Sequence, residues 1–154
     1  MVPYPPAQEA MTDDADTRPF NTHIEQLTPI GITTFRTCLN YEQATVHAEY
    51  GGEKIGNVLA TYTGFEWYIE DLYVEAHLRR KGIGRTLMYT LMRMCSEFAH
   101  DGFDVLPAGY ANEMKEEDRI TFYESLGFRL TDEAHGIYSL NFMEHYGLQG
   151  AIPA

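Results

Sequence analysis

One short segment of the chain combines the residue types that an anion-binding loop needs. Four of the eleven Lys and Arg residues of the 154-residue sequence fall within residues 79–85, where Gly82 and Gly84 are interleaved with them. Glycines allow backbone N–H groups to approach a ligand closely. The apolar periodicity that begins at Ile83 predicts a helix, whose N-terminus carries free donors and a positive dipole end. The segment therefore predicts a polyanion site, most naturally for a diphosphate.

The same two glycines also fit a simpler interpretation, in which they only permit a tight turn. The segment is not a Walker loop, because no Gly-Lys-Ser/Thr follows, and it lacks the three-glycine fingerprint of dinucleotide sites. Its context favours the anion site. A strand-like stretch over residues 67–74 precedes it, a helix follows, and basic charge is concentrated here in an otherwise acidic chain.

Two motifs in this region resemble those of a known family. Arg79-x-x-Gly82-x-Gly84, after Leu72-Tyr73-Val74, resembles the acetyl-coenzyme A signature of the GNAT N-acetyltransferase superfamily. Residues 122–128, Phe-Tyr-Glu-Ser-Leu-Gly-Phe, are similar to that family's C-terminal motif. The two motifs occur in the family's order, and the resemblance covers roughly residues 67–140.

This resemblance implies that acetyl-coenzyme A is the cosubstrate and that backbone amides of the loop and helix start hold its pyrophosphate. The positions that it assigns to this contact are Arg79, Arg80, Lys81, Gly82, Ile83 and Gly84, with Arg85 meeting a phosphate electrostatically. It also implies that the backbone of Leu72, Tyr73 and Val74 pairs with the pantetheine arm like an added strand. A backbone N–H near Val74 is then expected to stabilise the tetrahedral oxyanion.

Transfer of an acetyl group to an amine also needs a base and an acid. Glu70 and Asp71 directly precede the residues implied to bind pantetheine. Because adjacent strand residues normally point to opposite faces of a sheet, only one of these two carboxylates should face the acceptor. The run Ile-Glu-Asp-Leu-Tyr-Val at residues 69–74 resembles the polyamine acetyltransferase branch, which favours Glu70; an ion pair or cap at the sheet edge is the alternative for either acid. Tyr123 matches the family's general acid beside the sulfur, the alternative being a core aromatic.

The chain departs from the family pattern in two places. Glu116 stands where members usually have an asparagine that contacts the coenzyme. Asn112 lies ten residues before Phe122, so either the helix is longer and Asn112 makes this contact, or the contact is absent. Members usually also have two helices after the first strand, whereas here only residues 21–27 favour a helix, closed off by Pro29. The acceptor groove is therefore expected to be open, which suits a protein side chain or N-terminus, or to be completed by a second subunit in a homodimer.

The remaining patterns predict the elements that position these residues. Residues 30–74 favour strands, and Gly51-Gly52 is typical of a hairpin turn. A first helix is expected from the apolar face of Ile83, Leu87, Leu91, Met94 and Phe98, and it should end at Asp101-Gly102. A second helix is expected from an N-cap at Asn112 to about Leu126, with Gly127 as its stop. Strands are expected at residues 103–106 and 135–143. These elements predict an α/β (α+β mixed-sheet) fold: a GNAT-like twisted, mostly antiparallel sheet flanked by helices, with a reduced N-terminal helical part. One domain is expected over residues 22–154, after a flexible arm at 1–21.

Composition narrows the possible partners. The sequence holds 23 acidic and 11 basic residues, and its net charge of -12 disfavours binding to nucleic acid or to an anionic membrane. A cationic acceptor is favoured. Cys38, Cys95 and the six histidines show no metal-ligand spacing, so no metal is expected, and the absence of a signal peptide or membrane span predicts a cytoplasmic protein.

Together these patterns predict an acetyl-coenzyme A-dependent N-acetyltransferase. Its acceptor is a polyamine or other small amine, or a lysine or N-terminus of a protein. The alternative is a catalytically inactive protein on the GNAT scaffold that binds a basic partner protein through its acidic surface.

Overall fold

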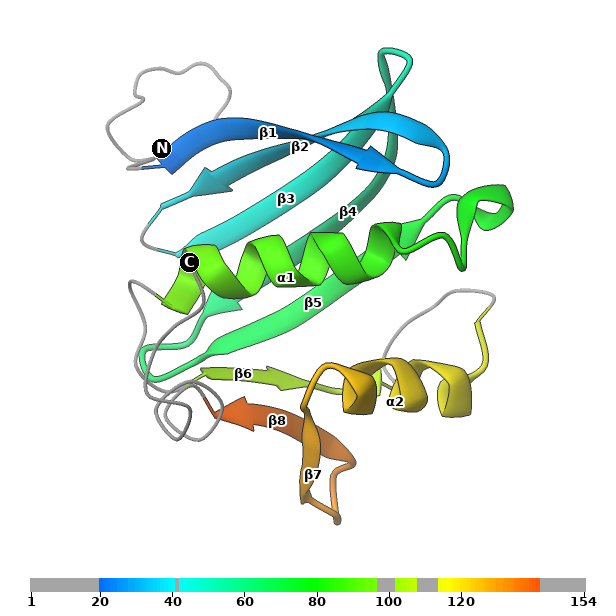
Figure 1. Cartoon of the computed structure of the whole chain (residues 1–154). Helices are drawn as coiled ribbons and strands as arrows, with labels where there is room; N and C mark the ends of the chain where they lie inside the picture. The colour runs from blue at the N-terminus through cyan, green and yellow to red at the C-terminus, as the bar shows by residue number, and fades with distance from the viewer. Residues whose placement is uncertain (1–19, 41, 97–101, 108–113, 142–154) are drawn as a thin grey trace.

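The chain is built on one eight-stranded sheet. The computed structural model describes residues 20–40, 42–96, 102–107 and 114–141. The strand order is β1-β2-β3-β4-β5-β6-β8-β7, and every neighbouring pair is antiparallel except β5 and β6, which are parallel. Two helices, α1 and α2, lie in front of the sheet (Figure 1). The predicted mixed, mostly antiparallel sheet flanked by helices is confirmed.

The first five strands form an antiparallel meander. They are β1 (Phe20–Thr28), β2 (Gly31–Leu39), β3 (Gln43–Tyr50), β4 (Glu53–Tyr62) and β5 (Trp67–Val74). Gly51 and Gly52 connect β3 to β4 with φ angles of 62° and 84°. A tight two-residue hairpin turn needs positive φ at both central positions, which glycine adopts without strain. The predicted strands over residues 30–74 are confirmed.

β1 takes the place of the short helix expected over residues 21–27, so that expectation is wrong. The strand pairs with β2 in continuous register from Phe20 to Thr28. A helix of seven residues is too short to be stable alone, whereas the β-branched Thr22 and Ile24 suit a strand. Within the described residues no α-helix precedes α1, and the predicted arm at residues 1–21 overlaps the start of this strand.

Helix α1 (Ile83–Ser96) crosses the sheet and leads the chain from β5 to β6 (Gly102–Val105), through a 3-10 turn at Ala76–Leu78 (η2). It packs on β2 to β5. Its buried face consists of Ile83, Leu87, Met88, Leu91, Met92 and Cys95. These residues confirm the predicted periodicity, although Phe98 and Asp101, at the predicted end of the helix, lie outside the described residues.

Helix α2 (Glu116–Ser125) is followed by the hairpin of β7 (Arg129–Asp132) and β8 (Ile137–Asn141). The expected start at Asn112 is wrong, because the N-cap is Lys115, whose carbonyl accepts the amides of Asp118 and Arg119 at 3.1 Å. Three acidic residues, 116–118, then occupy the first turn, where they favour the positive end of the helix dipole. Gly127 follows the helix with φ of 107° and is confirmed as the stop.

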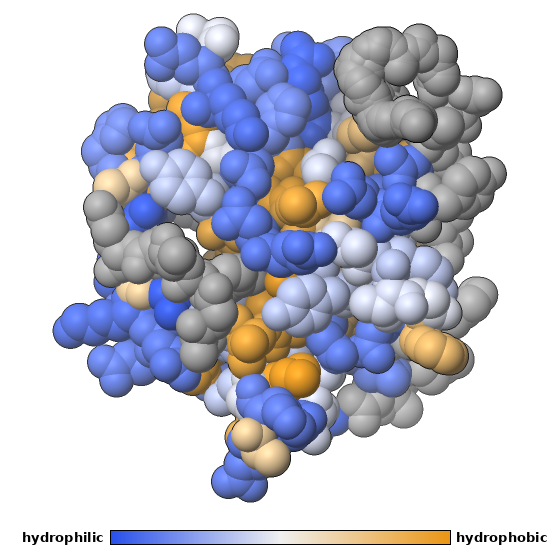
Figure 2. Space-filling view, turned by 180° about the vertical axis from the view of Figure 1, so that it is seen from behind, coloured by the Kyte–Doolittle hydropathy of each residue, from blue (hydrophilic) through white to orange (hydrophobic). Residues whose placement is uncertain are grey.

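The sheet has two different faces. Both helices lie on one face, the inner face, where Phe122 of α2 approaches Gly84 of α1. The opposite face, called the outer face below, has no helix over it among the described residues. Seen from behind, it mixes hydrophilic side chains with a smaller hydrophobic area towards its middle (Figure 2). In the described part of the chain, neither helix is long and apolar enough to cross a membrane.

Candidate functional site

The N-terminus of α1 is open to a ligand. The carbonyl of Gly82 accepts the N–H of Thr86 at 3.0 Å, so the amides of residues 83–85 have no acceptor within the helix. The first turn contains no acidic residue, and Gly82 has no side chain that could cap it. By contrast, α2 carries Glu-Glu-Asp at residues 116–118 in its first turn. Of these two helices, only α1 presents to an external anion a dipole end that no acidic side chain compensates.

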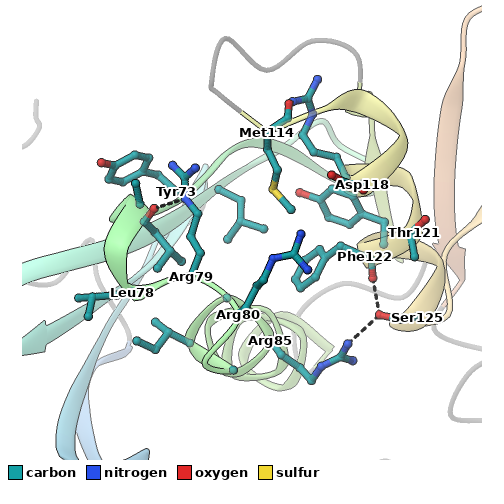
Figure 3. A pocket seen from close by; sticks show the side chains of 18 of the residues that line it. Tyr73, Leu78, Arg79, Arg80, Arg85, Met114, Asp118, Thr121, Phe122 and Ser125 are labelled. Atoms are coloured by element: carbon teal, nitrogen blue, oxygen red, sulfur yellow. Dashed lines mark hydrogen bonds between the residues drawn. The ribbon is translucent and has the colours of Figure 1, made fainter. Parts of the chain in front are cut away.

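The loop before α1 is folded tightly against β5. Arg80 and Gly82 adopt left-handed conformations, with φ of 63° and 82°, and this conformation is uncommon for an arginine. Arg79 folds back, and its Nε donates to the Val74 carbonyl oxygen at 2.8 Å. Its guanidinium lies 5.7 Å from the ring centroid of Tyr73. These contacts fix the loop to the end of the strand (Figure 3).

A cavity of about 800 Å³ lies between the end of β5, the start of α1 and helix α2 (Figure 3). This volume is within the range of small-molecule sites. The residues assigned to the coenzyme by sequence that line it are Leu72, Tyr73, Val74, Arg79, Arg80, Gly82, Ile83, Gly84 and Arg85. Lys81 lies in the same loop but does not line the cavity, and Asn112 lies outside the described residues. Four arginines lie along this cavity, Arg79, Arg80, Arg85 and Arg119, and their charge makes it attractive to an anion.

Strands β5 and β6 separate beside this cavity. Their parallel pairing covers only residues 67–69 of β5 and 103–105 of β6. Beyond it, no strand in the described part of the chain pairs with the β6 side of residues 70–74. The sheet therefore forks, and the open edge of β5 faces away from β4.

The backbone groups of this open edge can be assigned from the pairing on the other side. Glu75 donates its N–H to the Ile55 carbonyl at 2.9 Å, so its backbone groups face β4. Alternate residues of an antiparallel ladder point to the same side. Tyr73 therefore also faces β4, while the N–H and C=O groups of Leu72 and Val74 face the open edge. The fork thus offers strand-type donors and acceptors close to the helix terminus.

Comparison with known families places the sequence in one of them. The acetyltransferase (GNAT) domain family matches residues 41–130, more than half of the chain, and the match includes the loop before α1 and the Phe-Tyr motif of α2. The chain belongs to the GNAT acetyltransferase family. Among curated proteins, no relative matches the sequence.

Solved structures of GNAT proteins share the fold. The PaiA N-acetyltransferase from Thermoplasma acidophilum, in complex with coenzyme A, superimposes with a TM-score of 0.55 at 17% identity, over 65% of this chain and 61% of its own. The GNAT domain of S. lividans PAT gives a TM-score of 0.60 at 13% identity, over 78% and 96% of the two chains. A putative streptothricin acetyltransferase from Bacillus anthracis, in complex with acetyl coenzyme A, gives 0.54 at 16%, over 79% and 86%. None of these matches tests the resemblance to the polyamine branch.

In this GNAT chain Glu70 and Asp71 are both exposed on the outer face. The register between β4 and β5 shifts, because Leu59 pairs with Asp71 and Ala60 pairs with Ile69. Glu70 is therefore the extra residue of a β-bulge, which interrupts the alternation of side chains. The expectation that the two acids point to opposite faces of the sheet is wrong for this reason.

Each of these carboxylates has a hydrogen-bond donor on β4. The hydroxyl of Thr61 donates to Glu70, and Asn57 Nδ2 donates to Asp71 Oδ2 at 3.3 Å. Neither acid lines the cavity, although both directly precede Leu72, which does. The acids and the cavity are thus reached from different sides of the same strand.

Tyr123 lines the cavity and is 1% exposed. The end of α2 fixes its position, because Gly127 donates its N–H to Glu124 and Phe128 donates its N–H to the Tyr123 carbonyl at 3.1 Å. This pair of bonds is a Schellman motif. The Phe128 ring completes it by packing on the Tyr123 ring, with centroids 5.3 Å apart. The Gly-Phe end of the family motif therefore positions its tyrosine.

Apart from Tyr123, sequence analysis assigned no role to the cavity residues that α2 contributes. They share one helix face, at spacings of three and four, which could have identified them: Asp118, Thr121, Phe122 and Ser125, with Met114 and Lys115 in the preceding turn. Arg85 reaches this face, since its Nη2 donates to Ser125 Oγ at 2.8 Å. Arg119 is buried and donates to the carbonyls of Pro107 and Met114, so it anchors the turn before α2.

The outer face carries its own charged groups. Hydrogen bonds from Arg36 and then from His47, each at 2.9 Å, lower the pKa of Glu49 below its ordinary value. Asp104 of β6 lies beside β5 and accepts a hydrogen bond from Ser139. Among the described residues, no group of three or more His, Cys, Asp or Glu side chains could hold a metal ion. Acidic groups thus gather on the outer side of the fork, whereas arginines line the cavity.

Proposed function

We propose that the protein is an acetyl-coenzyme A-dependent N-acetyltransferase that transfers the acetyl group to a primary amine by direct attack. The observation that carries this proposal is the uncapped N-terminus of α1, which opens beside the arginine-lined cavity and the free edge of β5. A diphosphate with an extended amide-bearing arm fits both features. Membership of the GNAT family supports the same reading.

The residues present suit the coenzyme. The pyrophosphate accepts hydrogen bonds from the amides of Ile83, Gly84 and Arg85, and the left-handed turn at Gly82 exposes these groups. Leu72 supplies the backbone N–H and C=O groups that pair with the pantetheine arm, because the Val74 carbonyl already accepts a hydrogen bond from Arg79. Arg80 supplies positive charge from the loop, while Arg79 and Arg85 hold the strand and α2 in place. Bound there, the coenzyme supplies an activated acetyl thioester.

The chain's own groups then manage the protons. Glu70 accepts a proton from the acceptor ammonium, directly or through a water molecule, so that the neutral amine can attack the acetyl carbonyl. The Val74 N–H stabilises the negative charge that develops on the carbonyl oxygen. The Tyr123 phenol donates its proton to the departing sulfur. Asp71, on the same face as Glu70, is the second candidate for the base.

The acceptor approaches from the outer face. No helix covers that face in the described part of the chain, and Glu70, Asp71 and Asp104 give its forked region negative charge. A cationic amine is attracted to such a surface. An open face accommodates a lysine side chain or N-terminus of a protein as well as a polyamine or other small amine, and both classes belong in the acceptor screen.

Calorimetry with coenzyme A and a thiol-release assay test this proposal. We expect Glu70→Gln and Tyr123→Phe to lower kcat by about 10² to 10⁴-fold while the Kd for coenzyme A changes little. Asp71→Asn is the matched control for Glu70→Gln, since it removes a neighbouring carboxylate on the same face. An equal loss in that control would reassign the base. Retention of full turnover in both role variants would contradict the assignments.

The second candidate is an inactive GNAT protein that binds a basic partner through its acidic surface. The observation that favours it is Glu116, which is exposed at the start of α2 and lies outside the cavity, where the family pattern places an asparagine contact. A calorimetric titration that shows no binding of coenzyme A would exclude the first candidate and favour this one.

A further inference from the structure

Among the described residues, the outer edge of β1 is a long sheet edge with no strand or helix over it. β1 pairs with β2 along all nine residues, and no strand in the described ranges pairs with its other side. The row of N–H and C=O groups along such an edge is a template for pairing with another strand. Thr22 to Leu27 are all exposed, so neither α1 nor any other described element shelters this strand.

The edge also exposes an apolar side chain at its centre. Ile24 is 51% exposed and lies opposite Phe35, which is buried in the core on the inner face. Ile24 thus extends the apolar inner face beyond the reach of α1. A side chain of this kind gains most if another strand continues the sheet at this edge.

The sequence of β1 is complementary to itself. When two copies pair antiparallel about a two-fold axis through Ile24, the two Ile24 side chains lie opposite each other. In the same register, His23 of each copy lies opposite Glu25 of the other, and Thr22 lies opposite Gln26. Opposite-charge and apolar pairs stabilise neighbouring strands, whereas like charges directly opposite destabilise them. An isologous contact of this type closes as a dimer and leaves no further β1 edge exposed.

We propose that β1 is a homodimer interface, in which two copies of the chain join their sheets through antiparallel pairing of this strand centred on Ile24. The partner is a second copy because the His23 imidazole of each copy lies opposite the Glu25 carboxylate of the other, a donor and acceptor pair that occurs on both sides of one axis. The interface lies four strands from β5, so roughly 19 Å of sheet separates it from the fork at the ordinary strand spacing. The inference therefore does not depend on the proposed acetyl transfer.

Analytical ultracentrifugation of the full chain tests the dimer, with an expected mass of twice 17.6 kDa. His23→Glu places like charges opposite each other on both sides of the axis and should weaken dimerisation by at least about tenfold in Kd. The charge exchange His23→Glu with Glu25→Lys restores opposite pairs and should restore the dimer. Coenzyme A affinity and the circular dichroism spectrum should be unchanged in both variants.

A crosslinking experiment tests the register. In a Cys38→Ser background, Ile24→Cys should form an intersubunit disulfide under mild oxidation, because residues opposite each other across a strand pair have Cβ atoms close enough for the bond. Leu27→Cys is the matched control, since position 27 faces position 21 of the other copy and should not crosslink. A monomeric wild-type chain would overturn the proposal. So would a dimer that is insensitive to the charge changes or that crosslinks through position 27 instead of position 24.

Discussion

Replacing Gly84 by aspartate separates the stability of α1 from its capacity to bind an anion. Gly84 is the second residue of the helix, and its amide is one of the free donors. An added Cβ would meet Val74 Cγ2 at 3.7 Å and Phe122 Cζ at 3.8 Å, which are ordinary contacts. The substitution therefore fits without displacing the backbone and places a carboxylate at the mouth of the anion site.

The two expected effects have opposite signs. A helix-interior glycine is unfavourable, and an acid in the first turn interacts well with the dipole, so the free energy of unfolding should rise by roughly 0.5 to 1 kcal/mol. Binding should weaken. At about 5 Å and an effective dielectric constant of about 20 to 80, each pair of unit charges repels by roughly 1 to 3 kcal/mol. That energy corresponds to a roughly 5- to 150-fold increase in the Kd for coenzyme A.

Calorimetric titration with coenzyme A and urea unfolding measure the two effects on the same protein. Gly84→Asn is the matched control, because it adds almost the same volume without the charge. The difference in Kd between the two variants should shrink with added salt, which screens the repulsion. Equal affinities of Gly84→Asp and Gly84→Asn, or a loss of stability in proportion to the loss of binding, would refute the placement of an anion at this helix terminus.

Three further outcomes follow from the structure. Gly56→Ala should lower the free energy of unfolding by roughly 1 to 3 kcal/mol, because the new Cβ would lie 2.8 Å from the Tyr73 carbonyl oxygen. Urea unfolding measures this effect, and an unchanged midpoint would contradict the close approach of β4 and β5. The pKa of Glu49 is lower in the folded chain than in the unfolded chain, so this carboxylate stabilises the fold at pH values above its unfolded pKa. That contribution is lost as the pH falls through the folded pKa. Glu49→Gln should therefore flatten the acid limb of the stability curve, and identical limbs would exclude the contribution. Burial raises the pKa of Cys95, so Cys95 should react with a thiol reagent far more slowly than Cys38 in the native protein, as mass spectrometry can measure.

Local patterns were enough to predict the parts of the fold that depend on local interactions. The apolar spacing from Ile83 to Leu91 predicted α1, and Gly51-Gly52 predicted the β3–β4 hairpin. The glycines and arginines of the loop led to the cavity for the same reason, because a strand, a turn and a helix start are contiguous in sequence. The start of α2 depends instead on Arg119, which reaches back to the carbonyl of Pro107, and no local pattern contains that contact.

β1 shows a second limit of local patterns. Residues 21–27 alternate poorly and precede a proline, so a short helix was a reasonable interpretation of them. Their state is decided by β2, which offers a complete ladder from Gly31 to Leu39. A strand of this kind is stabilised by pairing with residues that are distant in sequence, and its propensity alone carries little information.

The bulge at Glu70 matters most for function. Strict alternation would send Glu70 and Asp71 to opposite faces, and the choice between them would then decide which acid meets the acceptor. The register shift against Leu59 and Ala60 places both on the outer face, where Thr61 and Asn57 donate to them.

The fork follows immediately, since pairing with β6 ends at Ile69. One local irregularity of β5 thus brings acidic side chains to the outer side of the strand while its next residues turn their backbone groups toward the arginine-lined cavity. The acidic pair Glu70 and Asp71 and the basic segment at residues 79–85 thus lie on different sides of a single strand, which suits the proposed reaction between a polyanionic donor and a cationic acceptor.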